Sequence, residues 1–331
     1  MSVAAAPEAS GGSTAAAAAN GATSGRWLGL DALRGLAIAA MILVNNPGSW
    51  RDGYQYAPLR HADWHGVTFT DLVFPTFLFC AGVAIVPALG RRVARGDDRM
   101  ALLRSVARRS LLLVLVGLLL QSFPFVSFAA DRPLFAPVLD ARWPGVLQRI
   151  GVAYGLGAVV FLTFGERTHR WLCWALLLGY WALITLVPVP GVGWPDLDDP
   201  ARTLQGYVDR LVFGRHVLRG GTFDPEGLLS TIPAVATVLF GVACGRLMVQ
   251  RTNVDDRVRG LLLYGAAWLA LGSVWDWFLS CNKALWTSSY AVFTAGVAAL
   301  GLGLCVHAFE RLGLRRLAFP LEVYGVNALL V

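Results

Sequence analysis

A series of about nine apolar segments constrains this chain more than any other feature of its sequence. Each is close to the roughly 20 residues that an α-helix needs to cross the hydrocarbon core of a bilayer. The composition agrees, because only 15% of the residues are charged, whereas soluble domains carry roughly 25%. The sequence therefore predicts an all-α fold, a polytopic transmembrane helix bundle with about nine or more helices. The predicted spans are Leu28 to Val44, Thr68 to Leu89, Leu103 to Gln121, Gly145 to Phe164, Trp171 to Val187, Gly227 to Val249, Gly260 to Leu279, Trp286 to Phe309, and Leu317 to Val331.

The arginines predict how the bundle is oriented, because short cytoplasmic loops carry an excess of Lys and Arg. The region after the second segment is the most basic, so we expect it to be cytoplasmic; it contains Arg91, Arg92, Arg95, Arg99 and Arg104. Alternation places three more basic loops on the same side: Gly165 to Arg170, Gln250 to Arg259 and Glu310 to Arg316. The N-terminus is then cytoplasmic, and the loop after the first segment is extracytoplasmic.

The two ends of the chain differ from the apolar middle. Residues 1–25 are rich in Ala, Gly and Ser and lack the basic start and apolar core of a signal peptide, which predicts a disordered cytoplasmic tail. Residues 26–331 then form a single transmembrane domain. The last apolar run stops at Val331 without a polar tail. Two interpretations stay open: a chain that continues further, or a short last helix.

Charge and cysteine usage exclude several classes of protein. The net charge of +7 resides in alternate loops rather than on one face with readout chemistry, which argues against a nucleic-acid partner. The cysteines lie in or at the ends of apolar runs without paired spacing, so we interpret them as core residues and expect neither a disulfide set nor a metal site. They are Cys80, Cys173, Cys244, Cys281 and Cys305.

One polar loop stands out between the first two apolar segments. His61 and His65 bracket Trp64 there, with Asp63 beside them. A histidine with a pKa near 6.5 can take a proton from an attacking amine or hydroxyl, or itself accept an acyl group. Metal binding by both would need a third ligand, and the sequence shows none at a recognisable spacing. The loop is therefore a candidate catalytic site, and its spacing alone does not separate the two histidines.

Ionisable residues within apolar segments are costly and by default indicate a site. Asp31 and Arg34 share one face near the cytoplasmic start of the first segment. They are either a structural ion pair or the place where an anionic cofactor approaches, since guanidinium suits phosphate. Asp71 begins the second segment, where a carboxylate can serve as a helix cap or in a functional site. Arg149 lies one turn into the fourth segment, toward its outer end.

Six runs in order cover nearly the whole chain from Arg26 onward and resemble the heparan-alpha-glucosaminide N-acetyltransferase family, including bacterial relatives. The runs are LDALRGLAIAAMILVNNPGSW, LRHADWHGVTFTDLVFPTFLFCAG, RWPGVLQRIGVAY, FDPEGLLSTIPAVATVLFGVACG, NKALWTSSYAVFTAG and YGVNALLV. The resemblance implies an enzyme that takes acetyl-CoA as cosubstrate from the cytoplasmic side, without a metal, and acetylates an amino sugar or glycan on the far side.

The resemblance also assigns roles within the polar loop. The family's reactive histidine lies in a His-x-x-Trp-x-Gly motif, which falls here on His61, Trp64 and Gly66. The family's asparagine at the end of the first helix matches Asn45, whose amide would orient the imidazole or donate to an oxyanion. The long lumenal domain of the animal enzyme is missing from this sequence. That favours a cell-wall, lipid-linked or capsular sugar as acceptor, and the cytoplasmic membrane of a bacterium as location.

Outer ends of the remaining runs provide candidates for a sugar-binding pocket, since carboxylates and amides bond hydroxyls and an aromatic face stacks on a sugar ring. Trp286 could instead be an interface anchor and Lys283, the only lysine, a solvated charge. Asp224 could be a helix cap. Together with Asp71, Trp64 and Arg149, the substrate-binding candidates are Glu226, Asn282, Lys283, Trp286 and Asn327.

The sequence thus predicts acetyl transfer across a membrane, with Arg34 and Asp31 at the acetyl-CoA phosphates and His61 as acetyl carrier or general base. Two other functions stay open: an O-acyltransferase of surface polysaccharide hydroxyls, and a transporter of a lipid-linked sugar. Transporters commonly contain inverted repeats, and the two halves of this chain show no convincing repeat. The oligomeric state is open as well, with a homodimer among the alternatives.

Overall fold

A computed structural model of the protein describes residues 27–48, 55–129, 131–218 and 221–327. The predicted cytoplasmic tail and residues 328–331 lie outside this part of the chain. Within it the fold is all-helical, and β-structure is limited to two isolated bridges. The long helices are α2 (Leu28–Val44), α3 (Phe69–Ala94), α4 (Arg99–Ser122), α6 (Val146–Thr163), α7 (Glu166–Leu186), α9 (Thr231–Gln250), α10 (Val254–Asp276), α11 (Ser288–Cys305) and α12 (Arg315–Val326). A π-helical stretch, Val306–Arg311, continues α11.

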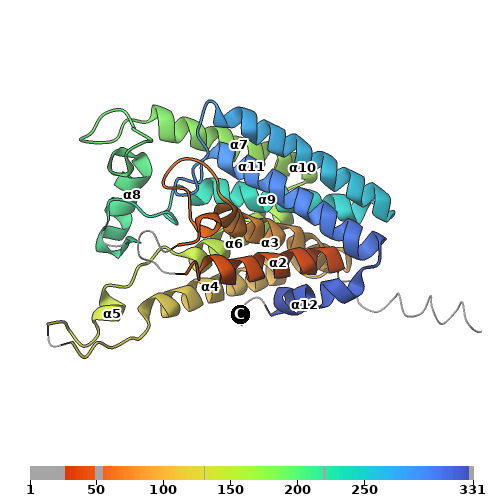
Figure 1. Cartoon of the computed structure of the whole chain (residues 1–331), viewed down its shortest axis with the longest axis horizontal. Coiled ribbons are helices and arrows are strands. Elements are labelled where there is room, and N and C mark those ends of the chain that lie inside the picture. Colours follow the sequence, from red (N-terminus) through yellow and green to blue (C-terminus); the bar gives the residue numbers. More distant parts are fainter. Residues whose placement is uncertain (1–26, 49–54, 130, 219–220, 328–331) are drawn as a thin grey trace, which may run out of the picture.

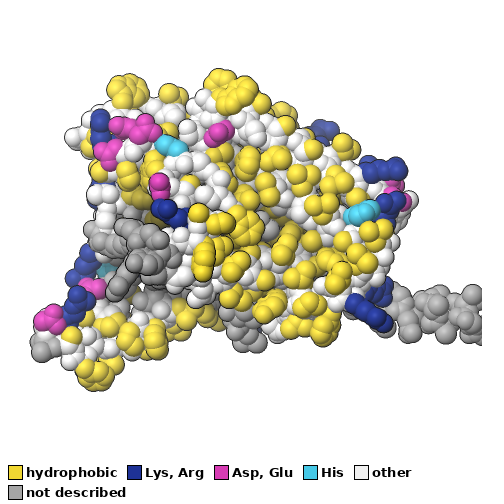
Figure 2. Space-filling model, viewed as in Figure 1, with side chains coloured by type: hydrophobic (Ala, Val, Ile, Leu, Met, Phe, Trp, Pro, Cys, Tyr) yellow, Lys and Arg dark blue, Asp and Glu magenta, His cyan; other side chains and the backbone are white. Residues whose placement is uncertain are grey.

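The long helices lie side by side, and the connections between them differ at the two ends of the bundle (Figure 1). One end carries the long connections, which include the loop before α3 and the short helices α5 (Ala136–Leu139) and α8 (Leu204–Phe213). The other end carries short turns. Charged side chains lie mostly toward these two ends, and hydrophobic side chains cover the flank between them (Figure 2). This is the surface expected of a bundle whose flank faces lipid.

Helix α9 lies in the middle of the bundle and packs closely on α3. Two glycines permit the approach. A Cβ at Gly82 would lie 2.0 Å from the carbonyl oxygen of Val238, and one at Gly241 would lie 2.1 Å from that of Phe79. Small residues let helix backbones come together in this way where lipid removes the hydrophobic drive for association. Helix pairs α10 and α11, α2 and α12, and α4 and α6 also pack together.

Five helices of the described residues are long and apolar enough to cross a membrane: Phe69–Ala94, Val146–Thr163, Thr231–Gln250, Val254–Asp276 and Ser288–Arg311. The prediction of an all-α membrane protein is thereby confirmed. Nine or more crossings and the cytoplasmic N-terminus stay predictions. Helix α10 exposes most of its apolar length, whereas α9 is buried, so α10 forms part of the outer layer.

Several helix ends differ from the predicted spans. Helix α4 begins at Arg99 rather than Leu103, because Asp98 caps it by accepting hydrogen bonds from the backbone N–H groups of Met100 (3.3 Å) and Ala101 (2.9 Å). Helix α3 likewise continues to Ala94. The apolar run ends where the arginines begin, but the helical backbone includes some of these arginines. Helices α9 and α11 begin later than predicted, because hydrogen-bonded loops precede Thr231 and Ser288.

Candidate active site

Asp71 is the buried centre of the polar loop at the start of α3. Thr68 and Asp71 form a capping box, in which Asp71 Oδ2 accepts from Thr68 N (3.1 Å) and Thr68 Oγ1 (2.9 Å). The same oxygen accepts from Ala62 N (3.1 Å). Its other oxygen, Oδ1, lies 2.6 Å from His61 Nδ1. Asp71 is only 1% exposed. It caps α3 and orients the His61 ring at the same time, so the interpretations of Asp71 as a helix cap and as a functional residue are compatible.

His61 combines a fixed ring with access to solvent. Its side chain is 52% exposed, although the carboxylate that holds it is buried. Because a carboxylate accepts hydrogen bonds, the contact with Asp71 places the imidazole proton on Nδ1. Nε2 then carries the free electron pair. The arrangement provides a base or nucleophile of defined orientation at the open end of the loop.

Lys283 brings a positive charge to the same pair. Its Nζ lies 3.4 Å from Asp71 Oδ1 and 3.1 Å from His61 Nδ1. Burial lowers the pKa of Lys283, and the charge of Asp71 opposes that shift only in part. The only lysine of the chain is therefore a member of this cluster, in contrast to the alternative of a solvated charge.

His65 lies in a different setting, four positions further along. Its Nε2 is 2.7 Å from Asp198 Oδ1, but the Asp198 side chain is 85% exposed. Its Nδ1 is 3.4 Å from Asn282 Nδ2. Asn282 itself is buried, and its Oδ1 accepts from Leu285 N (2.9 Å). Asn282 thus braces the loop before α11 and touches His65 rather than His61.

The other motif residues hold the loop in place. Gly66 has a φ of +102°, a conformation that residues with a Cβ rarely adopt, and its N–H donates to the carbonyl of Cys281 (2.8 Å). The Trp64 indole donates to the carbonyl of Leu197 (2.8 Å) and packs edge-on against Phe223. The motif therefore ties the histidine loop to the connection between α10 and α11 and to the long segment between α7 and α9.

Aromatic residues of α11 and the turn before it support the site from the protein interior. Tyr290 donates from its hydroxyl to the backbone carbonyl of Asp71 (2.6 Å). Trp286 is 1% exposed and packs edge-on against both Phe74 and Tyr290. The guanidinium carbon of Arg149 lies 5.1 Å from the Trp286 ring centre. Arg149 and Trp286 thus contact each other in the core, and their contact with a substrate stays a prediction.

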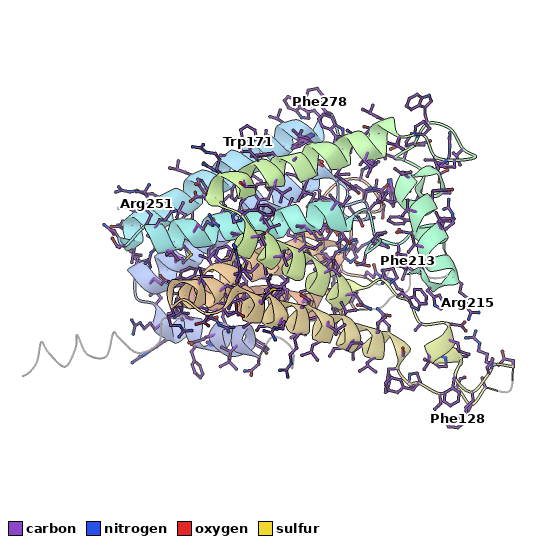
Figure 3. All side chains as sticks on the ribbon, turned by 180° about the vertical axis from the view of Figure 1, so that it is seen from behind. Phe128, Trp171, Phe213, Arg215, Arg251 and Phe278 are labelled. Carbon is purple, nitrogen blue, oxygen red and sulfur yellow. The ribbon has the colours of Figure 1, made fainter. Side chains whose placement is uncertain are left out.

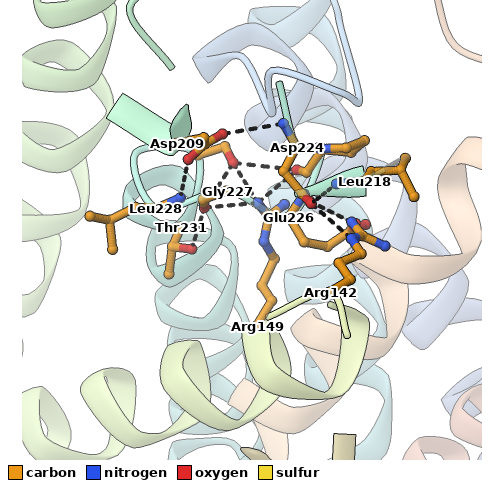
Figure 4. Close-up of polar contacts among 11 residues, drawn as sticks. Arg142, Arg149, Asp209, Leu218, Asp224, Glu226, Gly227, Leu228 and Thr231 are labelled. Atoms are coloured by element: carbon orange, nitrogen blue, oxygen red, sulfur yellow. Dashed lines mark hydrogen bonds and ion pairs between the residues drawn. The ribbon is translucent and has the colours of Figure 1, made fainter. Parts of the chain in front are cut away.

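A charged cluster lies beneath the loop that precedes α9 (Figure 4). Arg142 donates to both carboxylates of the DPEG run, Asp224 and Glu226, with a distance of 2.8 Å from Nε to Asp224 Oδ2. Arg149 donates through Nη2 to the carbonyls of Pro225 (2.7 Å) and Gly227 (3.3 Å). Both arginines therefore fix the loop, which extends from Asp224 to Ser230.

A second buried carboxylate completes this cluster. Asp209 of α8 accepts from Leu228 N (3.0 Å) and Asp224 N (3.3 Å). Burial raises the pKa of Asp209 to about 6, and these two hydrogen bonds limit the rise. Sequence analysis identified neither Asp209 nor Arg142, because each meets its partners across a separation that no local pattern reveals.

Asp31 and Arg34 lie toward the other end of the bundle. The guanidinium of Arg34 is 3.7 Å from Asp31 Oδ1. Both residues line a cavity of about 140 Å³ between α2 and α3, together with Trp27, Pro87 and Arg91. Arg34 and Asn45 are separated by 11 positions along α2, which corresponds to about 16 Å at 1.5 Å per residue. Arg91 lies 20 positions (91 − 71) beyond Asp71 on α3, about 30 Å at the same rise, so the cavity lies well away from His61.

Asn45 and Asn327 are likewise not joined to the His61 cluster in the described part of the chain. Asn45 ends α2 with an exposed side chain, and no hydrogen bond links it to His61 among the described residues. Asn327 ends α12, where its amide donates to the carbonyl of Val323 (2.9 Å). A role for either residue in the reaction stays a prediction. The residues that follow Asn45, 49–54, lie outside the described ranges.

Residues 26–270 match a family described as "Heparan-alpha-glucosaminide N-acetyltransferase, catalytic". The chain is similar to heparan-alpha-glucosaminide N-acetyltransferase of Homo sapiens, with 30% identity over 361 aligned positions that cover 92% of this chain and 52% of the human protein. It is similar to the Mus musculus protein of the same name, with 29% identity and coverage of 91% and 52%. The chain spans about half the length of these relatives.

Proposed function

The chain belongs to the heparan-alpha-glucosaminide N-acetyltransferase family, and from this premise we propose that it transfers acetyl from cytoplasmic acetyl-CoA to an amino sugar or glycan on the extracytoplasmic side. The observation that carries the proposal is the contact between His61 and the buried carboxylate of Asp71. A histidine oriented through Nδ1 by a carboxylate presents Nε2 as a base or nucleophile, which acyl transfer requires.

His61 can act by two routes. As acetyl carrier, Nε2 attacks the thioester carbonyl and CoA leaves as a thiolate. The acceptor amine then attacks the acetyl carbonyl, the imidazole leaves as the neutral ring, and the proton that the amine loses passes to the thiolate or to solvent. As general base, Nε2 removes the proton of the amine while the amine attacks the thioester, and that proton passes to the departing thiolate. In both routes the ring becomes positive, and Asp71 beside Nδ1 stabilises that charge.

Lys283 balances Asp71 in this mechanism. A buried carboxylate facing the imidazole strongly attracts positive charge on the ring. The ammonium group of Lys283, 3.4 Å from Asp71 Oδ1 and 3.1 Å from His61 Nδ1, offsets part of that attraction. Lys283 thus limits how strongly Asp71 stabilises the charge that the ring gains during the reaction.

The donor side rests on the cavity between α2 and α3. Arg34 and Arg91 line it from two helices, with Asp31 beside Arg34, and guanidinium groups suit phosphate oxygens. Its 140 Å³ accommodates a phosphate portion of acetyl-CoA rather than the whole molecule. The thioester would then extend along α2 toward the end that carries His61. Acetyl-CoA supplies the acetyl group as cosubstrate.

The acceptor side rests on polar groups near His61 that are at least partly exposed. Lys283, Glu226 and Trp64 meet this condition, whereas Asn282 and Arg149 are buried and shape the surrounding loops. A hexosamine bound beside His61 would meet a carboxylate, an ammonium group and an indole, which suit its hydroxyl groups and ring.

Acetylation by purified protein in liposomes tests the proposal. Labelled acetyl-CoA is supplied on the side of the basic turns and glucosamine on the side of His61. We expect acetylglucosamine to form and N-acetylglucosamine to be a poor acceptor. Equal use of both sugars would indicate O-acylation. Sugar movement without CoA-dependent product would indicate transport instead. Labelled acetyl retained on the protein without acceptor would identify the carrier route, provided that His61→Ala abolishes it.

A further inference from the structure

A cavity of about 400 Å³ lies between α4, α6 and the start of α9, and its lining contains none of His61, Asp71 and Lys283. Its lining includes Val114 and Leu118 of α4, Gln148, Arg149 and Val152 of α6, and Glu226. Figure 3 views the molecule from the side on which α4 lies in front, with Phe213, another lining residue, at the end of α8. The cavity is large enough for part of a lipid-sized molecule.

The mouth of this cavity borders the apolar flank of the bundle. Val152 lines the cavity and is 41% exposed. Leu115 and Leu119, on the outer surface of α4, and Leu156, one turn beyond Val152, are exposed in the same region. A ligand with an apolar chain could therefore enter sideways from the membrane, without passing through water.

Two of the residues that line the cavity are buried and carry hydrogen-bond donors. Gln148 is 7% exposed and Arg149 2% exposed. Gln148 Nε2 and the Nε and Nη1 of Arg149 have no hydrogen-bond partner among the residues that the structure describes. Buried donors without partners are costly. Since all three groups are donors, the matching ligand offers acceptor oxygens.

Charge around the cavity favours a neutral ligand. Arg142 pairs with Asp224 and Glu226, and Asp209 adds a third carboxylate to the cluster that Arg149 joins. Three carboxylates thus lie in a cluster with two arginines, and one of the carboxylates, Glu226, lines the cavity itself. An anionic head group would bring another negative charge beside Glu226.

We propose that this cavity binds a neutral membrane amphiphile, whose apolar chain lies between α4 and α6 and whose hydroxyl or carbonyl oxygens accept hydrogen bonds from Gln148 and Arg149. Glycosylated and acylglycerol lipids have this chemistry. The site goes beyond the proposed acetyl transfer and does not depend on it. It adjoins the candidate active site, because Arg149 contacts the Trp286 ring that supports Tyr290 and Asp71.

Photolabelling of the protein in phosphatidylcholine nanodiscs tests the site. The probe is dodecyl glucoside with a diazirine in its alkyl chain, and the anionic comparison is dodecyl phosphate with the same diazirine. We expect saturable labelling of peptides from α4 and α6 by the glucoside, and weaker labelling by the phosphate. Val152→Trp fills the cavity and should reduce glucoside labelling about tenfold, which corresponds to about 1.4 kcal/mol.

Leu156→Trp is the matched control, because Leu156 lies on the same helix with similar exposure but does not line the cavity. Its labelling should equal that of the wild type. Labelling that does not saturate, or that survives Val152→Trp, would overturn the site; stronger labelling by the phosphate would overturn the neutral head group. If Val152→Trp does not fold, competition by unlabelled dodecyl glucoside on the wild type decides, and failure to compete counts against the site.

Discussion

His61 and His65 belong to one short loop, yet the structure gives them opposite surroundings. His61 is held by a carboxylate that is 1% exposed, and Lys283 lies beside it. His65 contacts a carboxylate whose side chain is 85% exposed. A buried charge exerts a strong field, whereas a solvated one is screened. The comparison predicts that reactivity in this loop depends on which histidine reaches the helix cap, rather than on which residues are its sequence neighbours.

Removing each imidazole gives the largest expected contrast. His61→Ala should lower acetyl transfer by about 10³-fold or more, since it removes the base or nucleophile. His65→Ala should change the rate by only a few-fold. Transfer of labelled acetyl from acetyl-CoA to glucosamine measures both, with gel-filtration profiles and thermal unfolding as controls for folding. Equal losses would show that the contrast between the two surroundings has no catalytic meaning.

Replacing each carboxylate by its amide tests the same contrast through the partners. Asp71→Asn should lower the rate by about 10²-fold, because it removes the charge that orients His61 and stabilises its positive form. It should also destabilise α3 by about 1 kcal/mol through the weakened cap. Asp198→Asn, the exposed counterpart, should leave both rate and stability near wild type. A larger loss for Asp198→Asn than for Asp71→Asn would reverse the assignment.

Lys283 distinguishes the two histidines further, since its ammonium group lies beside His61 and Asp71. Lys283→Met should reduce transfer about tenfold, and Lys283→Arg should restore part of it by returning the charge. Because burial lowers the pKa of Lys283, the unfolded chain binds more protons here than the folded protein. Stability from this site therefore rises with pH, between the lowered folded pKa and the unfolded value near 10.4.

Thermal unfolding of wild type and Lys283→Met across that alkaline range measures the effect. The wild type should gain stability relative to the variant as pH rises. A constant difference between the two proteins would mean that Lys283 has the same pKa in both states.

The smallest expected effect concerns the loop backbone that both histidines share. Gly66→Ala forces a residue with a Cβ into a φ of +102°, which costs about 1 kcal/mol or somewhat more. We expect a lower melting temperature and a few-fold lower rate. Gly165→Ala is a suitable control, because Gly165 has an ordinary extended conformation and its Cβ would meet open space. Loss of stability in the control alone would contradict the role of the loop conformation.

Much of the fold could be predicted because hydropathy is a local property. The span Leu28 to Val44 coincides with α2, and the family assignment from the six ordered runs is confirmed. The ends of α4, α9 and α11 were less accurate, since caps and loop hydrogen bonds, rather than hydropathy, decide where a helix begins. The pattern of Thr68 followed three residues later by Asp71 was a readable capping signal, but it did not reveal that the same carboxylate holds His61.

The sequence by itself determined that the chain is a helical membrane protein of this family, and its motif singled out His61. These properties depend on composition and order along the chain. Only the tertiary structure decided that Asp71 and Lys283 both contact His61. It also decided that Asp198 contacts His65 and that Arg142 pairs with Asp224 of the DPEG loop. Such contacts join residues up to 222 positions apart, and packing of the helices, not any local pattern, brings them together.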